Sequence, residues 1–344
     1  MATSFLFSLI LLLITVLSLP FPLHASSVDP FSFGATTVRY WNRKIPNNAP
    51  HPDFFLSLLS PLPASLSSSL SSPLSISPSI CRSARLLCPN STYFQSLSNT
   101  VSIDGCSFGY TCTFEYEHDN FPTLKPGIFF REQELKEGNV VRMPDITNES
   151  TTARSFLPRS IADRIPFEAE AVKPLFGLEP NTTLAKAVDE TVAQCQSSPS
   201  KGETKRCVTS AEDMIDFAVA MLGDDIVVRS TVLPNGSGES IMIGKVKGIN
   251  SGKITSSVSC HEYLFPYMVY SCHSVPKIRV YEAEILSVQT KEKINSGVAV
   301  CHIDTSAWSA GHPAFVALGG KPGQNEVCHW IYNGSMTWVI ADKS

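Results

Sequence analysis

The chain carries little charge for its length. Only 17% of its 344 residues are Asp, Glu, Lys or Arg, below the roughly one quarter that is usual in globular proteins. Basic and acidic residues number 27 and 31, which gives a net charge of −4. A binder of nucleic acid or of anionic membranes needs a basic surface, so this balance argues against both classes. Hydrophobic residues reach 43%, which argues against wholesale disorder.

Charge is absent from the N-terminus, where the one long apolar run lies. No charged side chain precedes Asp29, and the run spans Phe5–Leu19. Because about 15 residues are fewer than the ~20 that cross a bilayer as a helix, the run predicts a signal peptide in preference to a membrane anchor. The small residues that follow Pro22 predict cleavage near Ala25. We therefore assign residues 1–25 to a signal peptide.

Cysteine and asparagine usage agree with secretion. The cysteines number ten, an even count, and in an oxidising compartment they are expected to pair as disulfides. Five Asn-x-Ser/Thr sequons predict N-glycosylation, at Asn90, Asn148, Asn181, Asn235 and Asn333. The mature protein is expected to be an extracellular glycoprotein.

The first part of the mature chain is low in complexity. Residues 55–79 are almost entirely Ser, Leu and Pro, and the prolines discourage a long helix. We interpret this stretch as a surface linker that ends an N-terminal segment, residues 26–79. A small cysteine-containing region, residues 80–125, follows. On one helix Cys81 and Cys88 would lie roughly 10 Å apart along the axis, so they pair with each other only if the segment bends.

Two helices are predicted between Thr182 and Gly223. Apolar residues at helical spacing end the first at Cys195. Thr209 and Glu212 form a capping box that starts the second, and Gly223 ends it. Cys207 lies just before this second helix, so a Cys195–Cys207 disulfide would join the pair.

The remainder predicts a mostly antiparallel β-rich half. Stretches rich in β-branched and aromatic residues alternate with turn residues. The predicted strands are 225–229, 240–249, 253–263, 267–275, 277–286, 297–304, 314–320, 326–332 and 336–342. Helices that precede strands indicate an α+β fold.

The chemistry-bearing motif is a Cys-His dipeptide that occurs four times in this half. The pairs are Cys260-His261, Cys272-His273, Cys301-His302 and Cys328-His329, with the spacing CH-x10-CH-x27-CH-x25-CH. Neighbouring side chains on a strand point to opposite faces. If the four segments lie in one sheet, the thiols could gather on one face and the imidazoles on the other. Four cysteines allow three disulfide connectivities, and the sequence does not choose among them.

Oxidised cysteines would leave the imidazoles as the metal ligands. A cluster of neutral imidazoles suits Zn, Cu or Ni, and outside the cell Cu(II) is the first candidate. The predicted ligands are His261, His273, His302 and His329, with His312 as an extra ligand or base. The alternative is that each is a hydrogen-bonded core histidine, and for His312 that it is a solvated loop residue.

The four-pair spacing resembles the defining signature of plant BURP-domain proteins, and Phe129-Phe130 resembles the start of that domain, taken here as residues 126–344. The strings FFREQELKEGNVVRMPDI, GETKRCVTSAEDMIDFA and CHIDTSAWSAGHPAF resemble the subfamily of the polygalacturonase non-catalytic β subunit. VRYWNRKIPNN resembles that subfamily's mature N-terminus. Its array of FxxY-type repeats is absent here, since about forty residues separate Cys88 from Phe129.

The resemblance implies a secreted, non-catalytic cell-wall protein that binds a polygalacturonase, another wall-modifying protein or a pectic polysaccharide. It does not imply a hydrolase, because the NTD, GHG and RIK strings of polygalacturonases do not occur. Some BURP proteins are instead copper-dependent peptide cyclases, which bind copper through the histidines of the Cys-His pairs. In that alternative the cross-link site would be Tyr40 or Trp41, and the substrate peptide must lie outside the folded core.

The first testable prediction concerns the thiols. Cys195–Cys207, Cys81–Cys88 and Cys106–Cys112 are the local pairings, and the four Cys-His cysteines complete the set. Titration of the denatured, unreduced mature protein should therefore find no free thiol. Several free thiols would contradict this framework and return cysteine to the candidate metal ligands.

Overall fold

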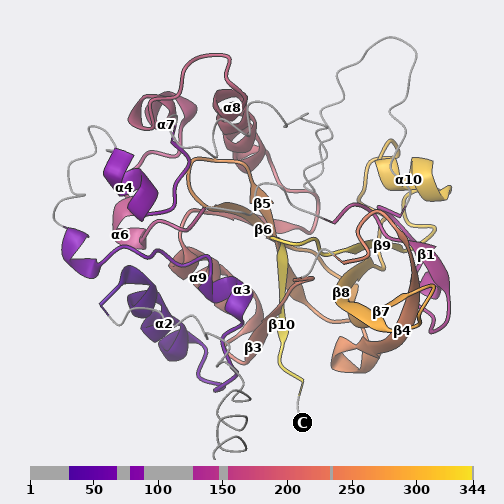
Figure 1. Ribbon diagram of the computed structural model, residues 1–344. Coiled ribbons are helices and arrows are strands. Elements are labelled where there is room, and N and C mark those ends of the chain that lie inside the picture. Colours follow the sequence, from indigo (N-terminus) through magenta and orange to yellow (C-terminus); the bar gives the residue numbers. More distant parts are fainter. Residues whose placement is uncertain (1–30, 68–77, 89–126, 147–153, 233–234, 343–344) are drawn as a thin grey trace, which may run out of the picture.

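The computed structural model describes residues 31–67, 78–88, 127–146, 154–232 and 235–342. Within these ranges, the strands form two five-stranded sheets whose paired strands are all antiparallel. Most helices gather around one sheet, and α10 lies beside the other (Figure 1). The expected α+β fold with disulfides is confirmed.

The first sheet has the strand order β1-β4-β7-β8-β9. Its strands are β1 (Val140–Arg142), β4 (Ser240–Gly248), β7 (Ile278–Ser287), β8 (Lys293–His302) and β9 (Val327–Trp330). Phe130 adds a backbone bridge to Cys328 on the outer edge of β9. The sheet curls, so the segment that carries Phe130 returns towards β1 at the opposite edge (Figure 1).

The second sheet has the order β2-β6-β5-β10-β3. Its strands are β2 (Thr204–Val208), β3 (Ile226–Arg229), β5 (Ser257–Tyr263), β6 (Val269–Ser274) and β10 (Met336–Ile340). The two sheets meet at a buried aliphatic cluster that includes Val280, Val300 and Val339. This contact places β8 and β9 close to β5.

The helices are mostly short. They are α2 (Phe33–Lys44), α3 (Asp53–Leu56), α4 (Pro78–Ser83), α6 (Arg159–Ala162), α7 (Ala169–Leu175), α8 (Thr183–Gln196), α9 (Ala211–Leu222) and α10 (Pro313–Leu318), with 3-10 turns η1 (Ala64–Ser67), η3 (Glu132–Glu134) and η5 (Ile249–Gly252). Among the described residues, no helix combines the length and the apolar character that crossing a membrane requires.

The two predicted helices are α8 and α9, with one correction at a cap. Gly223 ends α9 in a left-handed conformation, φ 86°, as expected. The N-cap, however, is Ser210 and not Thr209. The Ser210 hydroxyl accepts the backbone N–H of Asp213 at 3.1 Å. The capping signal was therefore placed one residue too early.

The prediction of a strand over 314–320 is wrong, because Pro313–Leu318 forms α10. Pro313 occupies the first turn, where a missing N–H costs nothing. The His312 Nδ1 atom accepts the Ala314 N–H at 3.1 Å and caps the helix. A short apolar run does not distinguish strand from helix by its pattern, so the capping chemistry decides here.

The surface-linker interpretation of residues 55–79 is also wrong for its first half. Phe55, Leu59 and Leu62 are each no more than 3% exposed. No long helix forms in the described part of this stretch, as the prolines predict, but its leucines pack into the core. Residues 68–77 lie outside the described part of the chain.

The N-terminal helix shares its core with the second sheet. Trp41 packs against Trp338 of β10 at 5.0 Å between ring centroids and against Phe55 at 4.8 Å. On the polar side of α2, the Tyr40 hydroxyl donates to Asp216 of α9 at 2.6 Å. The helix α2 therefore belongs to the same folded body as the β-rich half.

A buried ion pair fixes a second connection. Arg154 pairs with Glu262 of β5, and both side chains are at most 1% exposed. The Arg154 guanidinium also donates to the carbonyls of Tyr263 and Phe265 at 2.9 and 3.0 Å. Since an unpaired buried charge costs several kcal/mol, this pair holds residue 154 firmly against the sheet.

The burial of Trp41 generates a stability prediction. Trp41→Ala should lower the free energy of unfolding by about 3–5 kcal/mol, because it leaves a cavity against Trp338. Phe31→Ala is the control, since Phe31 is 79% exposed and should change stability by less than about 0.5 kcal/mol. Denaturant unfolding measures both. If Trp41→Ala lowers the free energy of unfolding no more than Phe31→Ala does, α2 does not contribute to the core.

Candidate functional site

The four Cys-His dipeptides lie on two antiparallel strand pairs. Cys260 of β5 directly faces Cys272 of β6, and Cys301 of β8 faces Cys328 of β9. Each facing pair forms a disulfide with a Cα–Cα distance of 4.0 Å. The four segments do not lie in one sheet, because the two strand pairs belong to different sheets. The alternation of side chains still sends each histidine to the face opposite its cysteine.

Two other expected disulfides are present. Cys195–Cys207 links the end of α8 to β2. Cys81–Cys88 also forms, because α4 ends at Ser83 and Arg85 adopts a positive φ of 51°. That reversal is the bend which the pairing requires. Cys106 and Cys112 lie outside the described residues.

The histidines approach one another in two pairs. The Nε2 atoms of His261 and His273 are 3.2 Å apart, and those of His302 and His329 are 3.3 Å apart. The ring centroids of His261 and His329 lie 6.3 Å apart, which brings the two pairs together across the two sheets. The structure thus gathers all four predicted ligands.

Burial favours the neutral form of three of these histidines, His261, His302 and His329. His261, His302 and His329 are 5–7% exposed. Desolvation holds the pKa of His261 and of His302 well below the ordinary value, and it lowers the pKa of His329 to about 4. Neutral imidazole is the form that binds a metal ion.

Hydrogen bonds at Nδ1 orient two of the rings. The His329 Nδ1 atom lies 3.1 Å from the Trp330 carbonyl oxygen, which only accepts, so Nδ1 carries the proton. The His273 Nδ1 atom lies 3.0 Å from the Glu203 carboxylate. In a neutral ring this leaves Nε2 as a lone pair directed at the partner histidine. Such outer contacts are typical of metal-binding histidines.

The distances within each pair fit a shared ion. Two nitrogens at roughly 2.0–2.1 Å from one tetrahedral ion lie about 3.3 Å apart, close to the separation in both pairs. Among the described residues, however, no group of three or more His, Cys, Asp or Glu side chains is gathered tightly enough to hold an ion. Each facing pair therefore offers two nitrogen ligands, and its Nε2–Nε2 separation is also that of a hydrogen bond, as expected for the alternative of hydrogen-bonded core histidines.

His312 is connected to the cluster through the ring of Trp308. Its centroid is 4.3 Å from that of Trp308, which in turn is 5.1 Å from His302. Burial lowers the pKa of His312 to about 4, and its Nδ1 atom caps α10. It is therefore not a solvated loop residue. Its role as an extra ligand or base stays a prediction.

Sequence reasoning missed Glu203 and Trp308 as neighbours of the cluster. Glu203 lies in the connection between α8 and β2, where nothing in the local sequence marks it. Trp308 follows His302 by six residues, and only the return of the chain towards α10 brings the rings together. Their positions depend on tertiary structure.

The predicted glycosylation sites differ in location. Asn181 and Asn235 are exposed, and Asn333 is partly exposed. The side chain of Asn235 donates to the Ile294 carbonyl at 3.1 Å. Asn90 and Asn148 lie outside the described residues.

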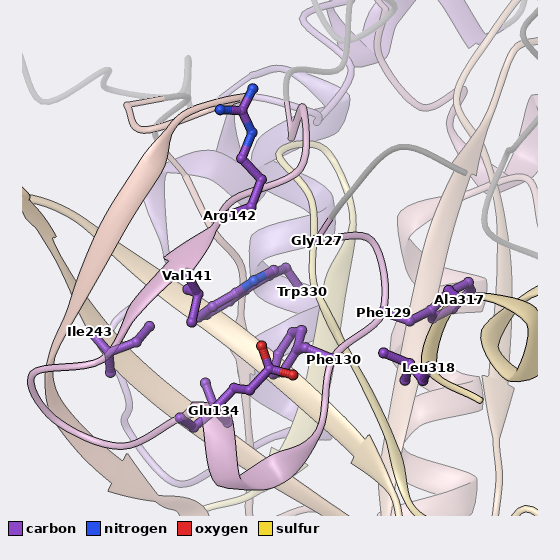
Figure 2. A pocket seen from close by; sticks show the side chains of 11 residues that line it. Gly127, Phe129, Phe130, Glu134, Val141, Arg142, Ile243, Ala317, Leu318 and Trp330 are labelled. Atoms are coloured by element: carbon purple, nitrogen blue, oxygen red, sulfur yellow. The ribbon is translucent and has the colours of Figure 1, made fainter. Parts of the chain in front are cut away.

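A pocket of about 400 Å³ lies apart from the histidines, between η3, β1 and α10 (Figure 2). Its wall includes Phe130 and Trp330, whose ring centroids are 5.2 Å apart. Of the described residues that line it, Glu134 is the only acidic one. Glycosidases use two carboxyl groups that flank the scissile bond, and this pocket supplies one.

Comparison with known proteins places the chain in a family. Residues 128–340 match the BURP domain, and the chain belongs to the BURP-domain family. It is 92% identical over 345 residues to BURP domain-containing protein 16 of rice (Oryza sativa subsp. japonica), with full coverage of both chains.

Other relatives are longer. The chain is 54% identical over 222 residues to the tomato (Solanum lycopersicum) polygalacturonase-1 non-catalytic subunit beta, which covers 64% of this chain and 35% of the relative. Identity and coverage are the same for polygalacturonase 1 beta-like protein 3 of Arabidopsis thaliana. The aligned region spans about a third of those proteins.

Proposed function

We propose that this chain is a secreted, non-catalytic protein of the plant cell wall that acts by binding polygalacturonase or pectic polysaccharide. The observation that carries the proposal is the 54% identity over 222 residues to a protein named a polygalacturonase non-catalytic subunit. The cross-strand disulfides support secretion, because such bonds persist in oxidising compartments.

The pocket geometry supports binding in preference to hydrolysis. The Glu134 carboxylate already accepts the Arg131 N–H at 2.9 Å and caps η3. A lone carboxylate in this role does not provide the acid and the base, or the acid and the nucleophile, that glycoside hydrolysis requires.

The binding prediction can be tested with the purified mature protein. We expect it to co-elute with a plant polygalacturonase or to be retained on immobilised polygalacturonate, and to release no reducing ends from pectin alone. Reduced and alkylated protein is the control, since it should lose binding with its fold. A folded protein that binds neither probe, or that cleaves pectin unaided, would contradict the proposal.

We further propose that the two histidine pairs hold a metal ion, with copper as the first candidate. The favouring observation is the 3.2–3.3 Å approach of facing Nε2 atoms within each pair. His261, His273, His302 and His329 would supply nitrogen ligands, and Glu203 and the Trp330 carbonyl would orient two of them. A bound copper ion would add redox capacity to the protein.

The peptide-cyclase alternative is weakened by the position of its expected substrate. Trp41 is 3% exposed and packs in the core against Trp338. Tyr40 is held by Asp216. A cross-link there would require α2 to leave the folded body, so metal retention without cyclisation is the reading that the geometry favours.

The metal prediction has matched variants. Wild-type protein should retain copper after gel filtration, also at pH 5.5, because the lowered pKa of His329 keeps that ligand neutral there. His302→Asn/His329→Asn should retain at most a tenth as much, while His51→Asn, which changes a histidine that contacts Asn42, should match wild type.

Metal content and intact mass of the same samples provide the measurement. Equal copper in the double variant and wild type would contradict the proposed ligands. A loss of two hydrogens located in the Tyr40-Trp41 peptide would instead support the cyclase alternative.

A further inference from the structure

The strands β8 and β9, which carry one histidine pair, are joined by a long connection. β8 ends at His302 and β9 begins at Val327, so residues 303–326 leave the sheet and return to it. The Cys301–Cys328 disulfide closes the base of this connection. Figure 1 shows its helix, α10, at the periphery of the molecule next to β9. Connections longer than about 12–15 residues in compact domains are usually functional, and active-site lids are among them.

Trp308 is the part of this connection that returns to the histidines. Its ring centroid lies 5.1 Å from that of His302, in an edge-to-face arrangement. His302 is 5% exposed, whereas Trp308 is half-buried. The Trp308 ring therefore reaches from the surface to the imidazole and covers it on that side. His312 and Phe315 pack against the Trp308 ring in turn, with centroids 4.3 and 6.1 Å away.

Arg131 ties the connection to a separate part of the chain. Its guanidinium donates to the carbonyl oxygens of Leu318 and Gly319, at the end of α10, at 3.2 and 2.8 Å. It also donates to the Glu326 carbonyl, where the connection re-enters the sheet. A cation is favourable at the C-terminus of a helix, where carbonyl groups lack backbone partners. Arg131 is therefore placed to hold α10 down.

Little apolar packing holds the connection in place besides these contacts. Its buried apolar residues are Ala314 and Phe315. Leu318 lines the pocket of about 400 Å³, so close packing is interrupted beside α10. The Thr305 hydroxyl donates to the Asn325 carbonyl at 3.0 Å, a bond within the connection itself. Segments with few buried apolar contacts open locally at the lowest free-energy cost, so these features suit a unit that opens while the sheets stay folded.

We propose that residues 303–326, called the lid here, close over the candidate metal site through Trp308 and are held shut by Arg131. The inference rests on the proposed metal-binding function and adds how an ion reaches its ligands. A metal ion enters or leaves the pair formed by His302 and His329 when the Trp308 ring moves away from His302.

The access of a small reagent to His302 tests the lid without any metal. Diethyl pyrocarbonate acylates accessible imidazoles, and peptide mass spectrometry measures the rate at each histidine separately. Trp308→Ala should raise the rate at His302 at least tenfold. The rate at His261, which belongs to the pair on the other sheet, should stay within twofold of wild type. Trp308→Phe, which keeps an aromatic ring, should restore most of the protection.

Two results of this experiment would overturn the proposal. One is an unchanged rate at His302 in Trp308→Ala, which would show that the ring does not limit access. The other is an equal rise at His261, which would show that the substitution loosens the whole fold.

A second variant tests the contact at Arg131 and leaves Trp308 in place. Arg131→Gln should free the end of α10 and raise the acylation rate at His302 severalfold. Lys321→Gln is the control, because Lys321 is an exposed cation of the same lid, and it should match wild type. Equal rates at His302 in the two glutamine variants would overturn the role of Arg131. This pair of variants decides the proposal if Trp308→Ala does not fold.

Copper(II) alone is the probe for metal exchange. Copper-loaded protein is mixed with excess EDTA, and the copper that remains bound is measured after rapid desalting. Trp308→Ala should release copper at least fivefold faster than wild type, from the same starting content. If both proteins retain copper and release it equally fast, the metal site stands and the lid is wrong. If wild type retains no copper, the metal function fails, and the acylation rates alone decide whether Trp308 and Arg131 close the site.

Discussion

The register of two strand pairs is the constraint on which the candidate metal site depends. Side chains alternate between the faces of a strand, so a slip of one residue would reverse every histidine and cysteine at once. Cys260–Cys272 and Cys301–Cys328 prevent that slip, because each joins directly facing residues. The disulfides thus set the direction of the imidazoles without contributing a ligand.

The second requirement is that the two sheets stay in contact. Neither strand pair brings more than two histidines together, and the approach of His261 to His329 depends on how the sheets pack. The aliphatic cluster that includes Val280, Val300 and Val339 maintains this packing. Burial also lowers the pKa of His261, His302 and His329, so packing controls the position of all four imidazoles and the protonation of these three.

Local signals in the sequence predicted what depends on local chemistry. Spacing and side-chain type predicted the two helices near Cys195, Cys207 and Gly223. They also predicted most strands and the alternation of side chains within each Cys-His pair. The helix at Pro313 and the burial of Phe55 were mispredicted, because short apolar stretches take their structure from capping and tertiary contacts. The pairing of the four Cys-His cysteines and the role of Glu203 require the sheet order, which no single segment encodes.

The anchoring of the chain on both sides of residues 89–126 has a consequence for longer members of the family. The Leu87 N–H donates to the Pro266 carbonyl at 2.8 Å, and Gly127 lies against the Arg142 carbonyl, so both ends are attached to one folded body. The entropic cost of closing a loop grows only with the logarithm of its length. A longer connection between these two anchors would therefore cost little additional free energy of folding, and the register of the histidine-bearing strands would be preserved.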